Sequence, residues 1–206
     1  MKLLAIVFVF MILPTISFSQ MVVERTTVSQ SLRLGYNIAP NISNIRAGSM
    51  LPDNASLFNG LGYRVGFRAD YSFNKTISIS PEIDWSFNGG GFTFSDSSQE
   101  DYLIMPASID FMVHVIIKKQ RENVSPYFLL GPNFKAPIFH KNKSTIFETT
   151  TDLAVNFGVG FEKRFPFFAF SPELRYSIGL WNINTHPSFQ SVNLHNVSLA
   201  LNFSRL

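Results

Sequence analysis

The residues of this chain best suited to chemistry are charged side chains that recur at alternate positions of predicted strands. Between residues 61 and 88, apolar side chains occupy odd positions and every charge except Lys75 occupies an even one. Because the side chains of a strand alternate between its two faces, these charges share one face. Extended to the other predicted strands, the same pattern selects Arg64, Arg68, Asp70, Glu82, Asp84, Asp110, His114, Lys135, Asp152, Glu162, Glu173 and Arg175.

Two roles fit this charged face: a polar track for ions, or a network of salt bridges that fills a narrow barrel. A barrel of about eight strands is just wide enough inside for side chains, and a buried charge must be paired. We therefore favour the structural network. The pairs that we expect join the neighbouring strands 61–72 and 76–87, and they are Arg64 and Arg68 with Glu82 and Asp84.

The sequence offers little for an enzyme. It has no cysteine, and its four histidines are scattered without the spacing of metal ligands. His195 and Ser198 are three positions apart, so on a strand they point to opposite faces and do not form a nucleophile–base pair. We expect no catalytic residue, metal site or cofactor. An enzyme stays the lesser alternative, because a triad is recognised by its geometry.

Alternation with period 2 recurs along the chain and predicts about eight strands. They cover residues 32–38, 61–72, 76–87, 103–115, 126–136, 152–162, 168–180 and 196–203. Several are much longer than an ordinary strand of about 5–6 residues. They match the roughly 9–11 residues with which a tilted strand crosses a bilayer.

The predicted connections alternate in length. Long loops cover 40–60, 89–101, 137–150 and 181–191, whereas short turns cover 73–75, 118–125 and 163–166. Short periplasmic turns and longer outer loops are typical of outer-membrane barrels. The basic residues of two short turns are expected to be solvated turn residues, with a partner or lipid headgroups as the alternative; they are Lys118, Lys119, Arg121, Lys163 and Arg164.

The first residues have the pattern of a secretory signal peptide. Lys2 precedes an apolar run from residue 3 to 13, and Ser17 and Ser19 are the small residues of a cleavage site before Gln20. The apolar run is too short for a membrane-spanning helix of about 20 residues. We therefore expect a signal peptide at 1–19 and one barrel domain at 20–206. The net charge of +3, without a basic stripe, predicts no nucleic-acid partner.

A soluble sandwich or lipocalin-type barrel also shows period 2, with its apolar face inward. Three features favour the membrane form: apolar positions uninterrupted by charge, small residues at the other positions, and aromatic residues near strand ends. The aromatic residues are Phe73, Phe87, Tyr102, Phe161, Phe168, Trp181 and Phe203. The sequence thus predicts an all-β protein, an eight-stranded antiparallel up-and-down transmembrane β-barrel of the bacterial outer membrane.

Five segments in order resemble the outer-membrane β-barrel family of Bacteroidota that includes PorT-like proteins. They are 66–68 with 80–83, 102–106, 126–132, 158–162 and 171–180. The resemblance implies a small outer-membrane barrel with membrane lipid, the barrel-assembly machinery and secretion-system or envelope proteins as partners. A structural or interaction role is our first expectation. The alternatives are a PorT-like component of type IX secretion and a narrow channel.

Overall fold

The computed structural model describes residues 31–48, 55–95, 101–121, 123–138, 146–147, 149–185 and 191–205. The predicted signal peptide at 1–19 lies outside the described residues. Within the described ranges, no helix is long and apolar enough to cross a membrane.

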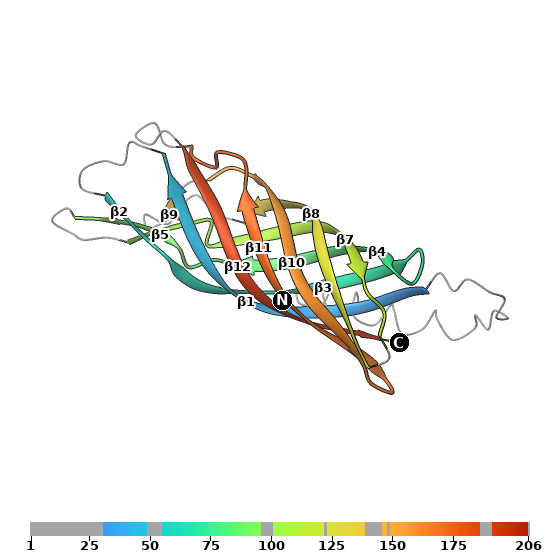
Figure 1. The fold of residues 1–206 in the computed structure, drawn as a ribbon. Helices are drawn as coiled ribbons and strands as arrows, with labels where there is room; N and C mark the ends of the chain where they lie inside the picture. Colours follow the sequence, from blue (N-terminus) through green and yellow to red (C-terminus); the bar gives the residue numbers. More distant parts are fainter. Residues whose placement is uncertain are drawn as a thin grey trace, which may run out of the picture.

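Eight long strands form a closed antiparallel barrel, which confirms the predicted fold (Figure 1). Their order around the wall is β1, β12, β11, β10, β8, β7, β4, β3. The strand β1 closes the barrel because it pairs with both β3 and β12. The bounds are β1 Ser31–Ala47, β3 Gly60–Ser72, β4 Ile77–Phe87, β7 Ala107–Lys118, β8 Val124–Pro137, β10 Asp152–Arg164, β11 Phe168–Gly179 and β12 Val192–Arg205.

The two ends of the barrel differ. The turn end carries the short connections β3–β4, β7–β8 and β10–β11 and the end of β12. The loop end carries a second sheet, seen at the opposite end in Figure 1, in the order β2, β5, β6, β9. Its strands are β2 Ala55–Phe58, β5 Gly91–Phe94, β6 Asp101–Ile104 and β9 Ile146–Phe147. The sequence predicted loops over most of this sheet.

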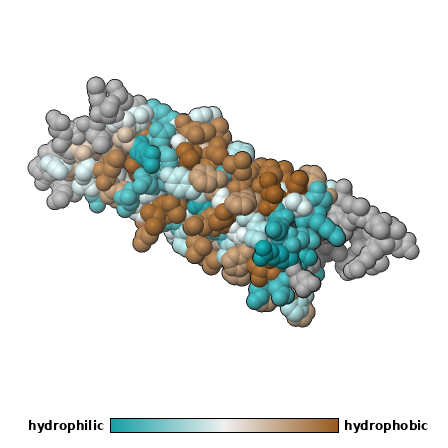
Figure 2. All heavy atoms as spheres, in the orientation of Figure 1, coloured by the Kyte–Doolittle hydropathy of each residue, from teal (hydrophilic) through white to brown (hydrophobic). Residues whose placement is uncertain are grey.

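The outer wall of the barrel is apolar. Leu34, Phe67 and Leu199 are 52%, 53% and 47% exposed, although each lies in the middle of a paired strand. Apolar residues cover much of the middle of the face shown in Figure 2, and hydrophilic ones gather toward the turn end. A soluble barrel would bury such side chains, so the inside-out arrangement expected from the sequence is the observed one.

The first strand is longer than predicted. We expected a loop from Pro40, but β1 runs through Pro40 to Ala47, and Pro40 pairs with Tyr63 of β3. Proline lacks a backbone N–H, so in a strand that is paired on both edges it removes a hydrogen bond to one of the two neighbouring strands. Here the register with β12 passes from Ile38 to Asn41, so Pro40 forms no bridge on that side.

The fourth predicted strand is two strands. Met105 adopts a positive φ of 48°, and the chain turns there between β6 and β7. Met105 is fully buried at the loop end rather than facing lipid as its odd position suggested. Period 2 holds only while the backbone stays extended, so the alternation from 103 to 105 was a coincidence.

Candidate functional site

The charged face predicted from the sequence lies inside the barrel. None of its charged residues is more than 6% exposed, from Arg64 on β3 to Arg175 on β11. Their alternation along paired strands aims them at one another across the lumen. The interior is therefore the part of this molecule where chemistry could be concentrated.

Two arginines and two glutamates, here called the central quartet, meet in the middle of the lumen. Arg175 donates from Nη1 and Nη2 to the two carboxylate oxygens of Glu82, at 2.7 and 3.0 Å. Arg68 donates from Nη1 to Glu173 at 2.7 Å, and the same nitrogen is 3.3 Å from Glu82. Arg175 also bonds Glu173 through Nε at 2.5 Å. Each charge thus faces two of the opposite sign, as a buried ion pair requires.

Neighbouring polar groups complete the quartet. Tyr127 of β8 donates its hydroxyl to Glu173 at 2.6 Å. His114 lies with Nδ1 3.4 Å from Glu82, and Asp70 accepts from Nε of Arg68 at 2.7 Å. The Tyr127 ring lies over Gly160, where a Cβ would come within 2.8 Å of it. The same Cβ would lie 2.8 Å from Cγ of Glu173, so the glycine leaves room for both partners of this hydrogen bond.

A second cluster closes the lumen at the turn end. Glu162 accepts from Lys118 at 2.6 Å, from Arg33 at 2.8 Å and from Arg164 at 2.9 Å. Lys118 is only 8% exposed, so the expectation of a solvated turn residue is wrong for it. Its long stem lets the ammonium turn back into the barrel mouth. The gap between this cluster and Asp70 has no room for a water molecule.

Arg64 does not make the predicted pairs with Glu82 or Asp84. It donates from Nη2 to Ser198 across the lumen at 2.5 Å and lies 4.0 Å from Asp110. Asp84 instead accepts from Asn37 at 2.8 Å. The register explains the difference, because Asp84 lies opposite Gly66 and Arg64 lies opposite Ser86.

The lumen changes from polar to apolar toward the loop end. Lys135 and Asp152 form an ion pair there, with 3.5 Å between Nζ and the carboxylate. Beyond them the inward side chains of β1 and β12 meet residues of β5, β6 and the β11–β12 connection. We call this cluster the apolar plug; it consists of Ile45, Phe92, Ile104, Met105, Ile183, Val192 and Leu194, each at most 4% exposed.

The described residues offer no metal centre. They contain no group of three or more His, Cys, Asp or Glu side chains arranged to hold a metal ion. His195 bonds the Tyr176 hydroxyl at 3.1 Å, whereas Ser198 bonds Arg64 inside the lumen. The arrangement is suited to holding the wall strands together through paired charges.

The family model described as outer membrane protein beta-barrel domain matches residues 18–185. The chain belongs to this family. Its place is therefore the bacterial outer membrane, and its apolar wall faces lipid. No curated protein matches the chain.

Solved structures of outer-membrane barrels are similar to this chain. Neisserial surface protein A is 12% identical, with a TM-score of 0.52 over 83% of this chain and 95% of that chain. OprG from Pseudomonas aeruginosa is 10% identical, with a TM-score of 0.48 over 85% and 94%. Ail of Yersinia pestis is 16% identical, with a TM-score of 0.42 over 84% and 98%. The likeness to Neisserial surface protein A is one of fold.

Arg33, Tyr127 and the residues of the apolar plug were absent from the predicted set of site residues. Arg33 alternates with the apolar positions Leu32 and Leu34, so its parity could have revealed it. Tyr127 has the interior parity of β8, but an aromatic residue there was not taken as a partner for a carboxylate. The plug residues of β5, β6 and the β11–β12 connection carry no such signal, because they follow no strand of the barrel.

Proposed function

We propose that this outer-membrane protein is a closed, non-catalytic barrel that anchors its loop-end sheet at the membrane and presents it to a partner. The observation that carries the proposal is the filling of the lumen at three levels. The Glu162 cluster, the central quartet and the apolar plug follow one another from the turn end to the loop end. Such a barrel would hold the loop-end sheet rigidly at the membrane surface.

The same observation argues against the narrow channel. An ion on its way through would have to separate Glu82 from Arg175 and then enter a plug made of apolar side chains. Breaking a buried ion pair costs about 3–5 kcal/mol. Moving an unpaired charge into apolar surroundings costs more.

Electrical recording in planar bilayers tests the closed barrel. We expect protein that migrates as folded to give no discrete conductance steps, while an open porin in the same bilayers gives them. Reproducible steps from the folded protein would contradict the proposal.

The loop-end sheet is the surface proposed to meet the partner. Backbone hydrogen bonds link the two segments that lead from the wall into this sheet: the Asn88 N–H donates to the Pro106 carbonyl, and the Ile104 N–H of β6 donates to the Gly90 carbonyl just before β5, both at 3.0 Å. Leu57 of β2 is 36% exposed on it. A photo-reactive residue at Leu57 should give a protein adduct in intact cells, whereas one at the lipid-facing Phe111 should not. Absence of a protein adduct from Leu57 would count against this surface.

A component of type IX secretion is a more specific form of the same role, and the resemblance to PorT-like proteins supports it. Gentle solubilisation and affinity purification distinguish a component of type IX secretion from a barrel with another partner. Recovery of secretion-system proteins with the barrel is the expected result for this form. Recovery of the barrel alone would contradict it.

Export and assembly are a further part of the proposal, and the predicted signal peptide supports them. We propose that cleavage precedes Gln20 and that the barrel-assembly machinery inserts the mature chain. Sequencing of the mature N-terminus should begin at Gln20. A mature protein that retains residues 1–19 would contradict this step.

A further inference from the structure

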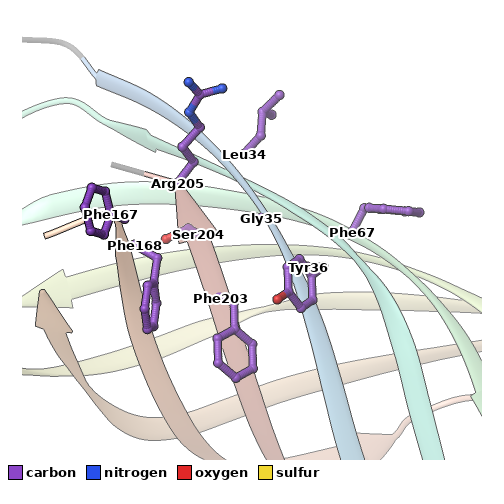
Figure 3. A pocket seen from close by; sticks show the side chains of 9 residues that line it. All are labelled: Leu34, Gly35, Tyr36, Phe67, Phe167, Phe168, Phe203, Ser204 and Arg205. Carbon is purple, nitrogen blue, oxygen red and sulfur yellow. The ribbon is translucent and has the colours of Figure 1, made fainter. Parts of the chain in front are cut away.

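An apolar groove lies on the outer wall at the turn end. It has a volume of about 600 Å³ and runs over the seam where β1 meets β12. Its lining comes from four strands and a turn, and Figure 3 shows the residues. They are Leu34, Gly35, Tyr36, Phe67, Phe167, Phe168, Phe203, Ser204 and Arg205.

The groove has an apolar side and a cationic end. The rings of Phe168, Phe203 and Tyr36 lie in a row, and Arg205 extends in the opposite direction (Figure 3). Tyr36 stacks on Phe203 with 5.3 Å between ring centroids, and Phe168 lies 6.3 Å from Phe203. The exposed Arg205 is the last residue of β12, so it lies where the wall meets water.

A second cation lies on the same outer face. Two residues at the start of β11 have cationic neighbours in the sheet register. Phe168 lies opposite Arg205 of β12, and Phe170 lies opposite Lys163 of β10. The Lys163 ammonium sits over the Phe165 ring at 5.2 Å from its centroid. Arg164, by contrast, is already paired with Glu162. The girdle of aromatic rings is thus bordered by positive charge at the level of lipid headgroups.

This combination matches one class of molecule. A guanidinium binds phosphate oxygens through paired, charge-assisted hydrogen bonds. Acyl chains are the natural cover of an apolar groove inside a bilayer. A ligand that has both parts, with a net negative headgroup, is an anionic glycerophospholipid.

Another groove on the wall provides a contrast. It has a volume of about 410 Å³ and lies between β8, β10 and β11, lined by Phe128, Phe157 and Val159 among others. Its cationic neighbour Arg175 points inward, where it is 2% exposed and paired with Glu82. This groove can hold an acyl chain but offers no charge to a headgroup.

We propose that the groove at the β1–β12 seam is a binding site for one anionic glycerophospholipid of the leaflet at the turn end, with its phosphate on Arg205 and an acyl chain along Tyr36, Phe203 and Phe168. This lipid site goes beyond the proposed role of the barrel, which is to anchor the loop-end sheet at the membrane. The site would make the β1–β12 seam select lipids with an anionic headgroup.

Tryptophan quenching by brominated lipids tests the site. The reporter is Phe167→Trp in a background in which Trp85 and Trp181 are replaced by Phe, and Leu34→Trp serves if that variant does not fold. The folded barrel is placed in phosphatidylcholine vesicles that contain a minor fraction of brominated phosphatidylglycerol or of brominated phosphatidylcholine. We expect about fivefold enrichment of phosphatidylglycerol at the reporter, the factor that one arginine contributes near an anionic surface.

Two matched variants decide the outcome. Arg205→Gln should remove the enrichment, and a Val159→Trp reporter in the second groove should show none. Enrichment that survives Arg205→Gln, or equal enrichment at both reporters, would overturn the proposal. A reporter shielded from both brominated lipids would also overturn it, because a second copy of the chain would then cover the groove. Addition of inorganic phosphate should leave the quenching unchanged, and displacement by it would contradict a lipid ligand.

Discussion

Arg68 on β3 lies directly opposite Glu82 on β4, with Nη1 of the arginine 3.3 Å from Oε1 of the glutamate. The register alone brings this pair together, and β11 then adds Glu173 and Arg175 from across the lumen. The quartet therefore ties strands that are not neighbours in the wall. Its loss should loosen the barrel as a whole.

Glu82→Gln should destabilise the barrel by about 3–5 kcal/mol, because Arg68 and Arg175 would remain buried with one carboxylate fewer. Asp84→Asn should cost less, since the Asp84 carboxylate bonds an uncharged amide, that of Asn37. Urea unfolding in vesicles, followed by heat-modifiable migration on gels, measures both. Equal losses for the two variants would contradict the assigned contacts.

Lys118→Gln should lower the free energy of unfolding by about 1–3 kcal/mol, because Glu162 loses a charged donor at 2.6 Å in a buried site. The neighbouring Lys119→Gln is the matched control. Lys119 is exposed, and its replacement should change stability by less than about 0.5 kcal/mol. The same unfolding measurement applies. An equal change in the free energy of unfolding for both variants would contradict the buried position of Lys118.

Gly160→Ala and Tyr127→Phe should not be additive. A Cβ at position 160 would come within 2.8 Å of both the Tyr127 ring and the Glu173 side chain, so Gly160→Ala already disturbs the 2.6 Å bond between the Tyr127 hydroxyl and Glu173. A double-mutant cycle should give a coupling of about 0.5–3 kcal/mol. A coupling of zero would mean that the two residues stabilise the barrel independently.

Val113→Lys tests the assignment of the outer wall. Val113 is 41% exposed on the lipid-facing side of β7, and a lysine near the middle of the bilayer should cost about 2–4 kcal/mol. Gln120→Lys, in the exposed β7–β8 turn, should have little effect. Stability in vesicles would be insensitive to both changes if this wall faced water.

The strands of the barrel could be predicted because a barrel with one lipid face imposes period 2 over whole strands. This constraint accounts for the apolar side chains at odd positions between Leu61 and Phe87. It also puts Arg68 and Glu82 on the same inner face, where the register places them opposite each other. The strand at Pro40 was missed because proline has no N–H to donate, and the sequence does not show that Pro40 forms no bridge to β12.

Contacts across the lumen lay beyond the sequence. Arg64 reaches Ser198, which is 134 positions away, and no local pattern distinguishes this partner from Asp84. The loop-end sheet was missed for another reason. Its strands have four residues or fewer, too short for alternation to separate them from loops.

The central claim is that the charged face is the filled interior of a closed barrel, and thiol accessibility tests it most directly. Because the chain has no cysteine, single cysteines can be introduced at Ser80 and Ser108 in the lumen, both 0% exposed, and at Gln120 in a turn. With a small water-soluble maleimide on protein folded in vesicles, Gln120→Cys should react readily and the two lumen variants only after unfolding. Rapid labelling of Ser80→Cys or Ser108→Cys in the folded barrel would contradict the account.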